Sequence, residues 1–269
     1  MATSHLIDVD GFALHAVEDG QGRPVVFGHG FLYDWRMWQE PMGMLAPEHR
    51  VVAWDSRGHG GSGLPVGDWT MEDQADDYIR VMDALGIDQA VVVGLSMGGM
   101  AALRLALRHP QRLRGLVLID TSAGGETLVR RTRYRMLSLL ARTFGIRPWL
   151  LKEASKVMYG ATFRRHHPER VREWTAPMAR FDPKVIARTL RPIVKRGSVV
   201  SRLPTITAPA LVIVGDEDQT TPPRESEVIA ERLPSARLVT LGATGHMSAL
   251  ERPEQTAALI REFLHEIGW

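Results

Sequence analysis

A serine lies among glycines at the end of an apolar run, in the stretch VVVGLSMGGM (Val91–Met100). Its centre, GLSMG (94–98), has the pattern G-x-S-x-G between an apolar run and a series of helix formers. A tight strand-to-helix turn brings backbone segments together, which explains glycines two residues before and after Ser96. Serine is also a favoured helix N-cap, so the stretch alone leaves a nucleophile and a cap as alternatives. The glycine spacings of phosphate-binding and dinucleotide-binding loops are absent from this turn.

A nucleophilic serine needs a base, and the base needs an acid that orients it. Downstream of Ser96, the run LVIVGDEDQTTPP places acids directly after an apolar segment, and LVTLGATGHMSALERP places His246 after the next one. Taken singly, such residues are also typical of turns and solvated loops. Both loops would follow parallel strands, at the sheet edge where Ser96 lies and where ligands bind in open α/β sheets. The order serine, acid, histidine therefore favours acyl-transfer chemistry.

Such loops require a sheet whose strands end at one edge. Short apolar runs rich in β-branched residues recur along the chain, and their near-continuous apolarity favours parallel strands covered on both faces. Helical patterns lie between the runs, for example at Thr70–Gly86, which begins with acidic turns and ends in glycine. This alternation predicts an α/β fold with a mostly parallel sheet. The runs are Pro24–Gly30, Arg50–Asp55, Ala90–Gly94, Gly115–Asp120, Ala210–Asp216 and Ala236–Gly242.

The two ends of the chain complete this pattern. The first residues, HLIDVDGFALHAVEDG, read as two strands joined at Asp10-Gly11, a hairpin turn signal that predicts an antiparallel edge. Two late helical patterns, PPRESEVIAERLP and PEQTAALIREFLHEIG, each start with proline, as helices often do.

The segment 121–205 differs from the rest in composition. The chain has 33 basic and 31 acidic residues, and 19 of the basic but only 5 of the acidic ones lie in this segment. It shows several helical patterns, among them RRTRYRMLSLLARTFG (130–145) and ERVREWTAPMARF (169–181), and no convincing strand, so we expect an all-helical insertion between two strands.

Composition excludes several classes of site. The 269 residues include no cysteine, so disulfides, thiolate nucleophiles and cysteine metal sites are excluded, which fits a reducing compartment such as the cytoplasm. The N-terminus lacks a basic stretch followed by an apolar core, so we expect no signal peptide. No apolar run approaches the roughly 18 residues of a membrane span. The basic segment carries no nucleic-acid-binding motif, so we expect no nucleic-acid partner.

Five motifs stand out along the chain: FGHGF (27–31), DSRGHGGS (55–62), GLSMGG (94–99), GDEDQTTP (215–222) and GHM (245–247). Together they make the sequence similar to the α/β-hydrolase superfamily over nearly the whole chain. The resemblance implies an eight-stranded, mostly parallel sheet flanked by helices, with a helical lid inserted after the sixth strand. Residues 1–120 and 206–269 would then form the core, and 121–205 the lid.

The resemblance also implies roles for single residues. Ser96 matches the family's nucleophile and His246 its base. Asp218 matches the acid, because the family pattern after strand seven is G-x-x-D, which Gly215–Asp218 fits. Three other acids are rivals for that role: Asp216, Asp120, which lies where some members place the acid, and Glu126.

By the same resemblance, two backbone N–H groups would form the oxyanion hole. They belong to Phe31, which follows the His-Gly pair, and to Met97, which follows the nucleophile. His29 is then structural and not a base, and Arg57 and His59 belong to loop scaffolding near the site. No metal or cofactor is implied.

The stretch GLSMGGMAALRLALRHPQRLRGLVLIDTSA resembles the 3-oxoadipate enol-lactonase-like and esterase branches. HGFLYDWRMW departs from the lactonase pattern, which has His-Ser in place of His-Gly, so we expect a general carboxylic-ester hydrolase of esterase or lactonase type. A cofactor-free perhydrolase or a C–C bond hydrolase would use the same triad. A non-catalytic ligand-binding protein is the alternative of another class. Haloalkane dehalogenase activity is disfavoured, because those enzymes have aspartate at the position of Ser96.

We expect the partner to be a small-molecule ester or lactone. The basic lid favours an anionic substrate, since a cleft lined by one charge concentrates the opposite one, although charge runs are also typical of solvated helix faces. The sequence indicates no oligomeric state. The candidate pocket residues are Trp35, Trp149, Met158, Tyr159 and Met247.

Overall fold

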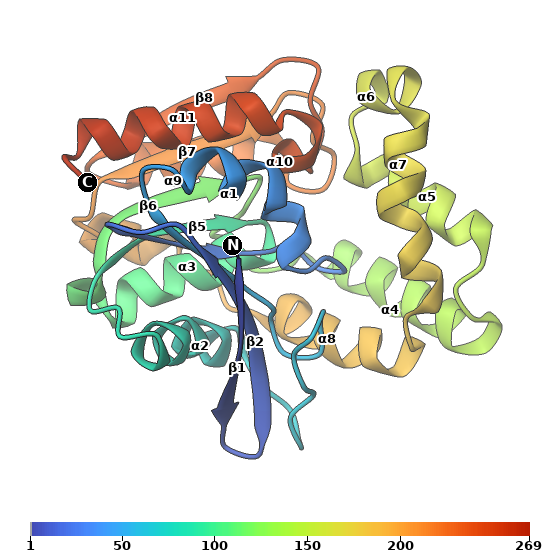
Figure 1. Ribbon diagram of the computed structural model, residues 1–269. Helices are drawn as coiled ribbons and strands as arrows, with labels where there is room; N and C mark the ends of the chain where they lie inside the picture. Colours follow the sequence, from blue (N-terminus) through green and yellow to red (C-terminus); the bar gives the residue numbers. More distant parts are fainter. Residues whose placement is uncertain (1) are drawn as a thin grey trace.

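The computed structural model describes residues 2–269, including all their side chains except that of Arg133. Its centre is an eight-stranded sheet of order β1-β2-β4-β3-β5-β6-β7-β8 (Figure 1). β1 and β2 pair with each other antiparallel, β2 pairs antiparallel with β4, and the other pairs are parallel. The predicted α/β fold with an antiparallel edge is therefore confirmed. The strands are β1 (Thr3–Val9), β2 (Phe12–Asp19), β3 (Pro24–Gly28), β4 (Arg50–Trp54), β5 (Ala90–Leu95), β6 (Leu113–Ile119), β7 (Ala210–Gly215) and β8 (Ala236–Leu241).

The edge hairpin turns at the residues that the sequence indicates. Asp10 and Gly11 both have positive φ, 46° and 91°. Two positive φ values in succession match the right-handed twist of the flanking strands, and aspartate and glycine tolerate them best.

Helices cover both faces of the sheet, because successive side chains of each central strand point to opposite sides. In β3, Val26 packs in the apolar cluster with the helices α2 and α3, whereas Val25 and Phe27 pack in the cluster with α1 and α11. The core therefore has two layers separated by the sheet. The flanking helices are α1 (Gln39–Leu45), α2 (Met71–Ala84), α3 (Met97–Arg108), α9 (Pro223–Arg232), α10 (Ser248–Glu251) and α11 (Pro253–Glu266), with the 3-10 turns η1 (Trp35–Trp38) and η2 (Pro110–Arg112).

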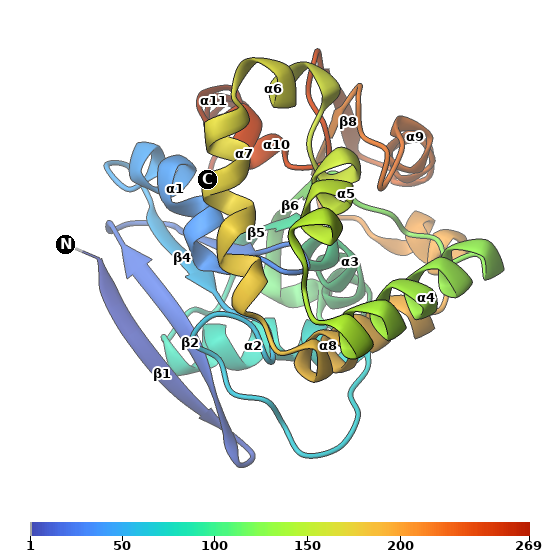
Figure 2. The ribbon, with the colours of Figure 1, turned by 90° about the vertical axis from the view of Figure 1, so that its right-hand side faces the viewer.

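Only helices and 3-10 turns lie between β6 and β7 in the described chain, and Figure 1 shows most of them standing beside the sheet. The helix α4 packs along α8, as Figure 2 shows from the side. The division of the chain into a core and a lid remains a prediction. These elements are α4 (Leu128–Phe144), α5 (Pro148–Met158), α6 (Ala161–His166), α7 (Pro168–Thr175), η3 (Ala176–Arg180), α8 (Pro183–Lys195) and η4 (Val200–Thr205).

The two ends of this helical segment are joined to each other. The Arg196 guanidinium forms a buried ion pair with Glu126 (2.7 Å) and donates to the Gly124 carbonyl (3.0 Å). The Val199 N–H donates to the Ala123 carbonyl (2.8 Å). Thus the chain leaves and re-enters the sheet region at neighbouring points.

Among the described residues, no helix is both long and apolar enough to cross a membrane.

Candidate active site

Ser96 sits on a strained turn between β5 and α3. Its φ and ψ are 51° and −110°, a backbone conformation that residues other than glycine rarely adopt. A Cβ on Gly94 would lie 2.5 Å from the Gly98 carbonyl carbon, and one on Gly98 would lie 2.2 Å from the Gly28 carbonyl oxygen. Both glycines are therefore required by close backbone contact. Although Ser96 occupies the N-cap position of α3, its side chain makes no capping hydrogen bond.

The hydroxyl of Ser96 instead faces His246. His246 Nε2 lies 2.9 Å from Ser96 Oγ, and His246 Nδ1 lies 2.8 Å from Asp218 Oδ2. All three side chains are buried. The structure thus brings together the three residues expected from the sequence in one hydrogen-bonded chain.

The acid is fixed by its own loop. Asp218 Oδ1 accepts hydrogen bonds from the Thr220 and Thr221 N–H groups (2.7 and 2.9 Å), and Oδ2 accepts one from the Thr221 hydroxyl (2.8 Å). These donors fix the orientation of the carboxylate toward His246. Burial lowers the pKa of His246, but the charge and hydrogen bond of Asp218 outweigh it, and the pKa is raised above its ordinary value.

The rival acids have other partners in the structure. Asp120 is buried at the end of β6, where it accepts from the Gly215 and Ser248 N–H groups (both 3.0 Å). Burial, and then the charge of Asp218, raise its pKa well above the usual range. Asp216 accepts from the Thr244 N–H (3.1 Å), and Glu126 pairs with Arg196. Of the four acids, only Asp218 hydrogen-bonds to His246 among the described contacts.

The loop after β3 lies against the nucleophile. A Cβ on Gly30 would be 3.7 Å from the Ser96 Cβ. His29 supports this loop: its Nε2 accepts from the Ser56 N–H (2.8 Å), so Nδ1 carries the proton and donates to the Gly30 carbonyl (2.7 Å). No hydrogen bond of the described residues uses the N–H of Phe31 or of Met97. Both amides are therefore available to an acceptor.

The motif DSRGHGGS supports the loop after β3 through hydrogen bonds. The Asp55 carboxylate accepts from the Trp35 and Gly61 N–H groups (2.7 and 2.8 Å). Arg57 forms a two-pronged ion pair with Asp77 (2.5 and 2.8 Å). Burial, and then the nearby His29, lower the pKa of His59 to about 3. His59 is therefore neutral, in keeping with a supporting role.

Four of the five candidate pocket residues share one apolar cluster. Tyr159 and Met247 are buried in it, and Trp35 and Met158 pack against it. Trp149 does not join them, since it lies at the start of α5 with half of its surface exposed.

Several residues of the site were not foreseen. Glu251, on α10, is buried, and its carboxylate accepts from the N–H groups of Gly160 (3.2 Å), Gly245 (2.9 Å) and Met247 (3.4 Å). It therefore links Gly245 and Met247, the two chain neighbours of His246, to Gly160 at the junction of α5 and α6. Burial raises the pKa of Glu251 to about 7, although the three amides oppose this.

The acid loop is tied to the same junction. Glu217 accepts from the hydroxyl and the N–H of Thr162 (2.5 and 2.8 Å), and the Thr220 hydroxyl donates to the Val157 carbonyl (2.9 Å). The hydroxyls of Tyr159 and Tyr33 also meet at 2.7 Å. The sequence gives no sign of these contacts, because each joins residues that are far apart in the chain and meet only in the folded structure.

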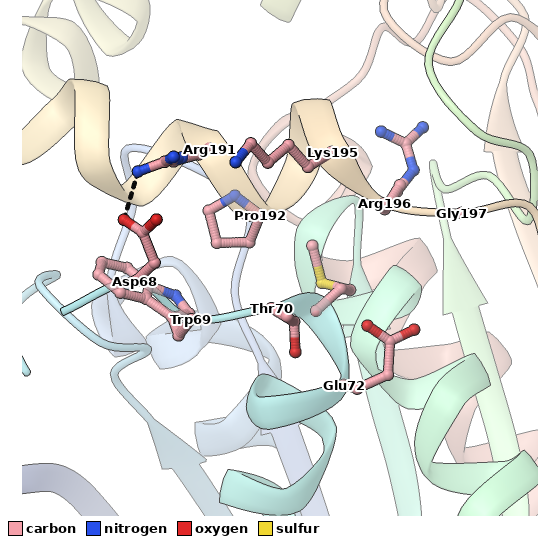
Figure 3. Close-up of a pocket in the computed structure, with 10 residues that line it drawn as sticks. Asp68, Trp69, Thr70, Glu72, Arg191, Pro192, Lys195, Arg196 and Gly197 are labelled. Atoms are coloured by element: carbon pink, nitrogen blue, oxygen red, sulfur yellow. Dashed lines mark hydrogen bonds and ion pairs between the residues drawn. The ribbon is translucent and has the colours of Figure 1, made fainter.

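A surface pocket of about 290 Å³ lies elsewhere, between the start of α2 and the end of α8 (Figure 3). Asp68 and Arg191 form an ion pair there, and Thr70, Lys195 and Gly197 also line it. No triad residue lines this pocket, so it is separate from the candidate active site.

Comparisons with known proteins identify the family of this chain. A family model described as alpha/beta hydrolase fold matches residues 23–253. The 3-oxoadipate enol-lactonase 2 of Acinetobacter baylyi is 29% identical over 90% of this chain and 89% of its own. The 2-hydroxymuconate semialdehyde hydrolase of Pseudomonas sp. (strain CF600) is 30% identical over 93% and 89%. A thermophilic esterase from Thermogutta terrifontis, solved with malate bound, superimposes with a TM-score of 0.91 at 31% identity, covering 98% and 99%. The chain therefore belongs to the alpha/beta hydrolase fold family.

Proposed function

We propose that this hydrolase cleaves a carboxylic ester or lactone through an acyl-enzyme on Ser96. The observation that carries the proposal is the continuous relay from Asp218 through His246 to a serine on a strained turn. A helix cap would need neither a buried histidine nor an acid behind it. The similar enol-lactonase and esterase support this choice of bond.

In the first half of the reaction, His246 Nε2 takes the proton of the Ser96 hydroxyl as its oxygen attacks the substrate carbonyl. The hydrogen bond from His246 Nδ1 to Asp218 keeps Nε2 free to accept that proton, and the carboxylate stabilises the imidazolium. His246 then gives the proton to the leaving alcohol oxygen. An acyl ester remains on Ser96.

In the second half, His246 removes a proton from water, whose oxygen attacks the acyl carbonyl. The bond to Ser96 Oγ then breaks, His246 returns the proton to that oxygen, and the acid is released. Negative charge develops on the carbonyl oxygen in both halves. The free N–H groups of Phe31 and Met97 would stabilise it, each contributing about 10²–10³-fold in rate.

Carbon–carbon bond hydrolysis is the second candidate, because the similar 2-hydroxymuconate semialdehyde hydrolase is named for a substrate that is neither an ester nor a lactone. Perhydrolysis on the same triad is a third. An anionic substrate stays a prediction: the described contacts bring no basic side chain of 121–205 to Ser96, and Arg196 is paired with Glu126. For a chain without cysteine we propose a cytoplasmic location.

A substrate panel tests the proposal. Wild type and Ser96→Ala are assayed with p-nitrophenyl esters, lactones, dicarboxylic monoesters and a vinylogous 1,5-diketone. We expect wild type to hydrolyse members of the first three groups, and Ser96→Ala to lose about 10⁴-fold or more in rate. Circular dichroism checks that the variant is folded. Hydrolysis that persists in Ser96→Ala, or turnover of the diketone alone, would contradict an ester or lactone hydrolase.

A further inference from the structure

Exposed large apolar side chains gather on one part of the helical segment. Of the eight such side chains in the described structure, six lie between residues 128 and 149. Single exposed apolar residues are ordinary, but a contiguous group marks an interaction surface. The six are Leu128, Val129, Met136, Leu139, Phe144 and Trp149.

Three of the six lie on one face of α4. Leu128, Met136 and Leu139 recur at helical spacing, and Arg135 and Arg142 fall beside them on the same exposed side. We call these five residues the α4 face. The helix also packs on α8. Leu139 and Arg142 border a surface pocket with Asp182, Pro183 and Lys184 at the start of α8. All five side chains of the α4 face are nevertheless exposed, Leu139 over 63% of its surface.

The charge along α4 has one sign. From Thr127 to Lys152 the sequence has six arginines and no acidic residue. Among the described ion pairs, none includes Arg135, Arg142 or Arg147. A second copy of the chain would bring these positive charges against one another. An anionic partner would be attracted to them.

We propose that the α4 face binds the surface of an anionic lipid bilayer, with α4 lying in the headgroup plane. A helix with arginines beside an apolar face suits this surface, because the apolar side chains enter the headgroup boundary while the cations contact lipid phosphates. Trp149, at the α4–α5 corner, is a side-chain type that favours that boundary. The proposal stands independently of the reaction at Ser96.

The position of α4 permits this contact. Figures 1 and 2 show α4 and α5 at the outer side of the molecule, away from the β1–β2 hairpin and from the helices α1 and α11. A flat surface can therefore meet the α4 face without displacing an element of the sheet region.

Vesicle sedimentation tests the proposal. The full chain is mixed with vesicles of phosphatidylcholine alone or of phosphatidylcholine with phosphatidylglycerol, at low and high salt. We expect binding to the anionic vesicles only, falling as salt rises, because attraction between exposed charges is screened. Tryptophan emission should shift to the blue on binding, and Trp149→Phe should reduce that shift.

Paired variants separate the two components. Arg135→Gln with Arg142→Gln should weaken partitioning about thirtyfold, from about 1 kcal/mol per arginine. Met136→Ser with Leu139→Ser should weaken it by a similar factor or more, since each removes buried methylene area. Control pairs carry the same changes elsewhere: Leu6→Ser with Val66→Ser, both exposed, and Arg202→Gln with Arg232→Gln, also exposed. The controls should bind like wild type.

Three results would overturn the proposal. One is the absence of binding to anionic vesicles at low salt. Another is equal loss of binding in the control and α4-face variants, which would show attraction to net charge alone. The third is a concentration-dependent dimer in light scattering that the Met136 and Leu139 variants dissolve, which would show that a second copy covers the face. Circular dichroism confirms that each variant is folded.

Discussion

At the scale of the residue, the charge of Asp218 sets how strongly His246 binds a proton. Burial alone would lower the pKa of this histidine, and the carboxylate 2.8 Å from Nδ1 reverses the shift. A base must be neutral to accept the proton of Ser96. The rate should therefore rise with pH as the imidazolium of the free enzyme loses its proton.

We predict that Asp218→Asn changes both the height and the position of this profile. The amide removes the largest effect that opposes burial and leaves only the weaker charges of Asp120 and Glu251. The midpoint of kcat/KM against pH should therefore move to lower pH, while the plateau should fall about 10⁴-fold. Asp216→Asn, on the same loop, is the matched control and should keep the wild-type midpoint. A midpoint that stays in place in Asp218→Asn would show that Asp218 does not set the proton affinity of His246.

Candidate site residues could be predicted from the sequence where a motif directly follows a predicted strand. Ser96, Asp218 and His246 each follow an apolar run, so their order and edge could be read from the sequence. Glu251 could not be assigned in this way. Its role depends on three N–H groups that come from two loops, more than eighty residues apart in the chain between Gly160 and Gly245.

At the scale of the element, the junction between α5 and α6 touches both triad loops. A Cβ on Gly160 would lie 2.6 Å from Glu217 Oε2, 2.9 Å from the Gly245 nitrogen and 3.1 Å from Glu251 Oε2. The space at this residue is filled from three directions. The position of the loop that carries His246 and the position of the helical segment therefore depend on each other.

We predict that Gly160→Ala lowers the free energy of unfolding by about 1–3 kcal/mol, because an added methyl group must displace backbone. It should also lower kcat, since the displaced backbone adjoins His246. Gly197→Ala is a control in the same segment, where no atom lies within 4 Å of the added Cβ. That variant should stay within about 0.5 kcal/mol of wild type in urea unfolding. Equal effects of the two substitutions would contradict a specific contact at Gly160.

Element types followed from the sequence better than their ends. The apolar runs match β3–β8 to within two residues, because continuous burial leaves a strong pattern. The sequence pattern predicts a helix from Arg130, but α4 begins at Leu128 in the structure, because Thr127 caps it by accepting from the Arg130 N–H. The pattern ERVREWTAPMARF divides into α7 and η3, and Pro177 at the division lacks the N–H that an α-helix would use. Local chemistry of this kind shifts boundaries without changing the fold.

At the scale of the whole molecule, Glu251 links stability to pH. Burial raises its pKa to about 7, whereas an unfolded glutamate titrates near about 4.3. Between these values the folded chain holds a proton that the unfolded chain has released. The free energy of unfolding should therefore fall as pH rises through this window.

We predict that Glu251→Gln removes this dependence. The loss of stability of wild type from about pH 5 to about pH 8 should exceed that of the variant by about 2–3 kcal/mol. Urea unfolding at the two pH values measures the difference. Glu254→Gln, exposed on α11, is the control and should follow wild type. Parallel curves for wild type and Glu251→Gln would rule out a titrating carboxyl at this position.

The joined ends of the helical segment have a consequence for how such chains diversify. Arg196 meets Glu126 and Gly124, and Val199 meets Ala123, so the segment begins and finishes at one small base. A replacement joined at these points would not stretch the sheet, but it would have to supply the contacts that Gly160 and Thr162 make with Glu251 and Glu217. The outer helices of the insert can therefore vary in sequence and outline, whereas its α5–α6 junction must stay matched to the loops of Asp218 and His246.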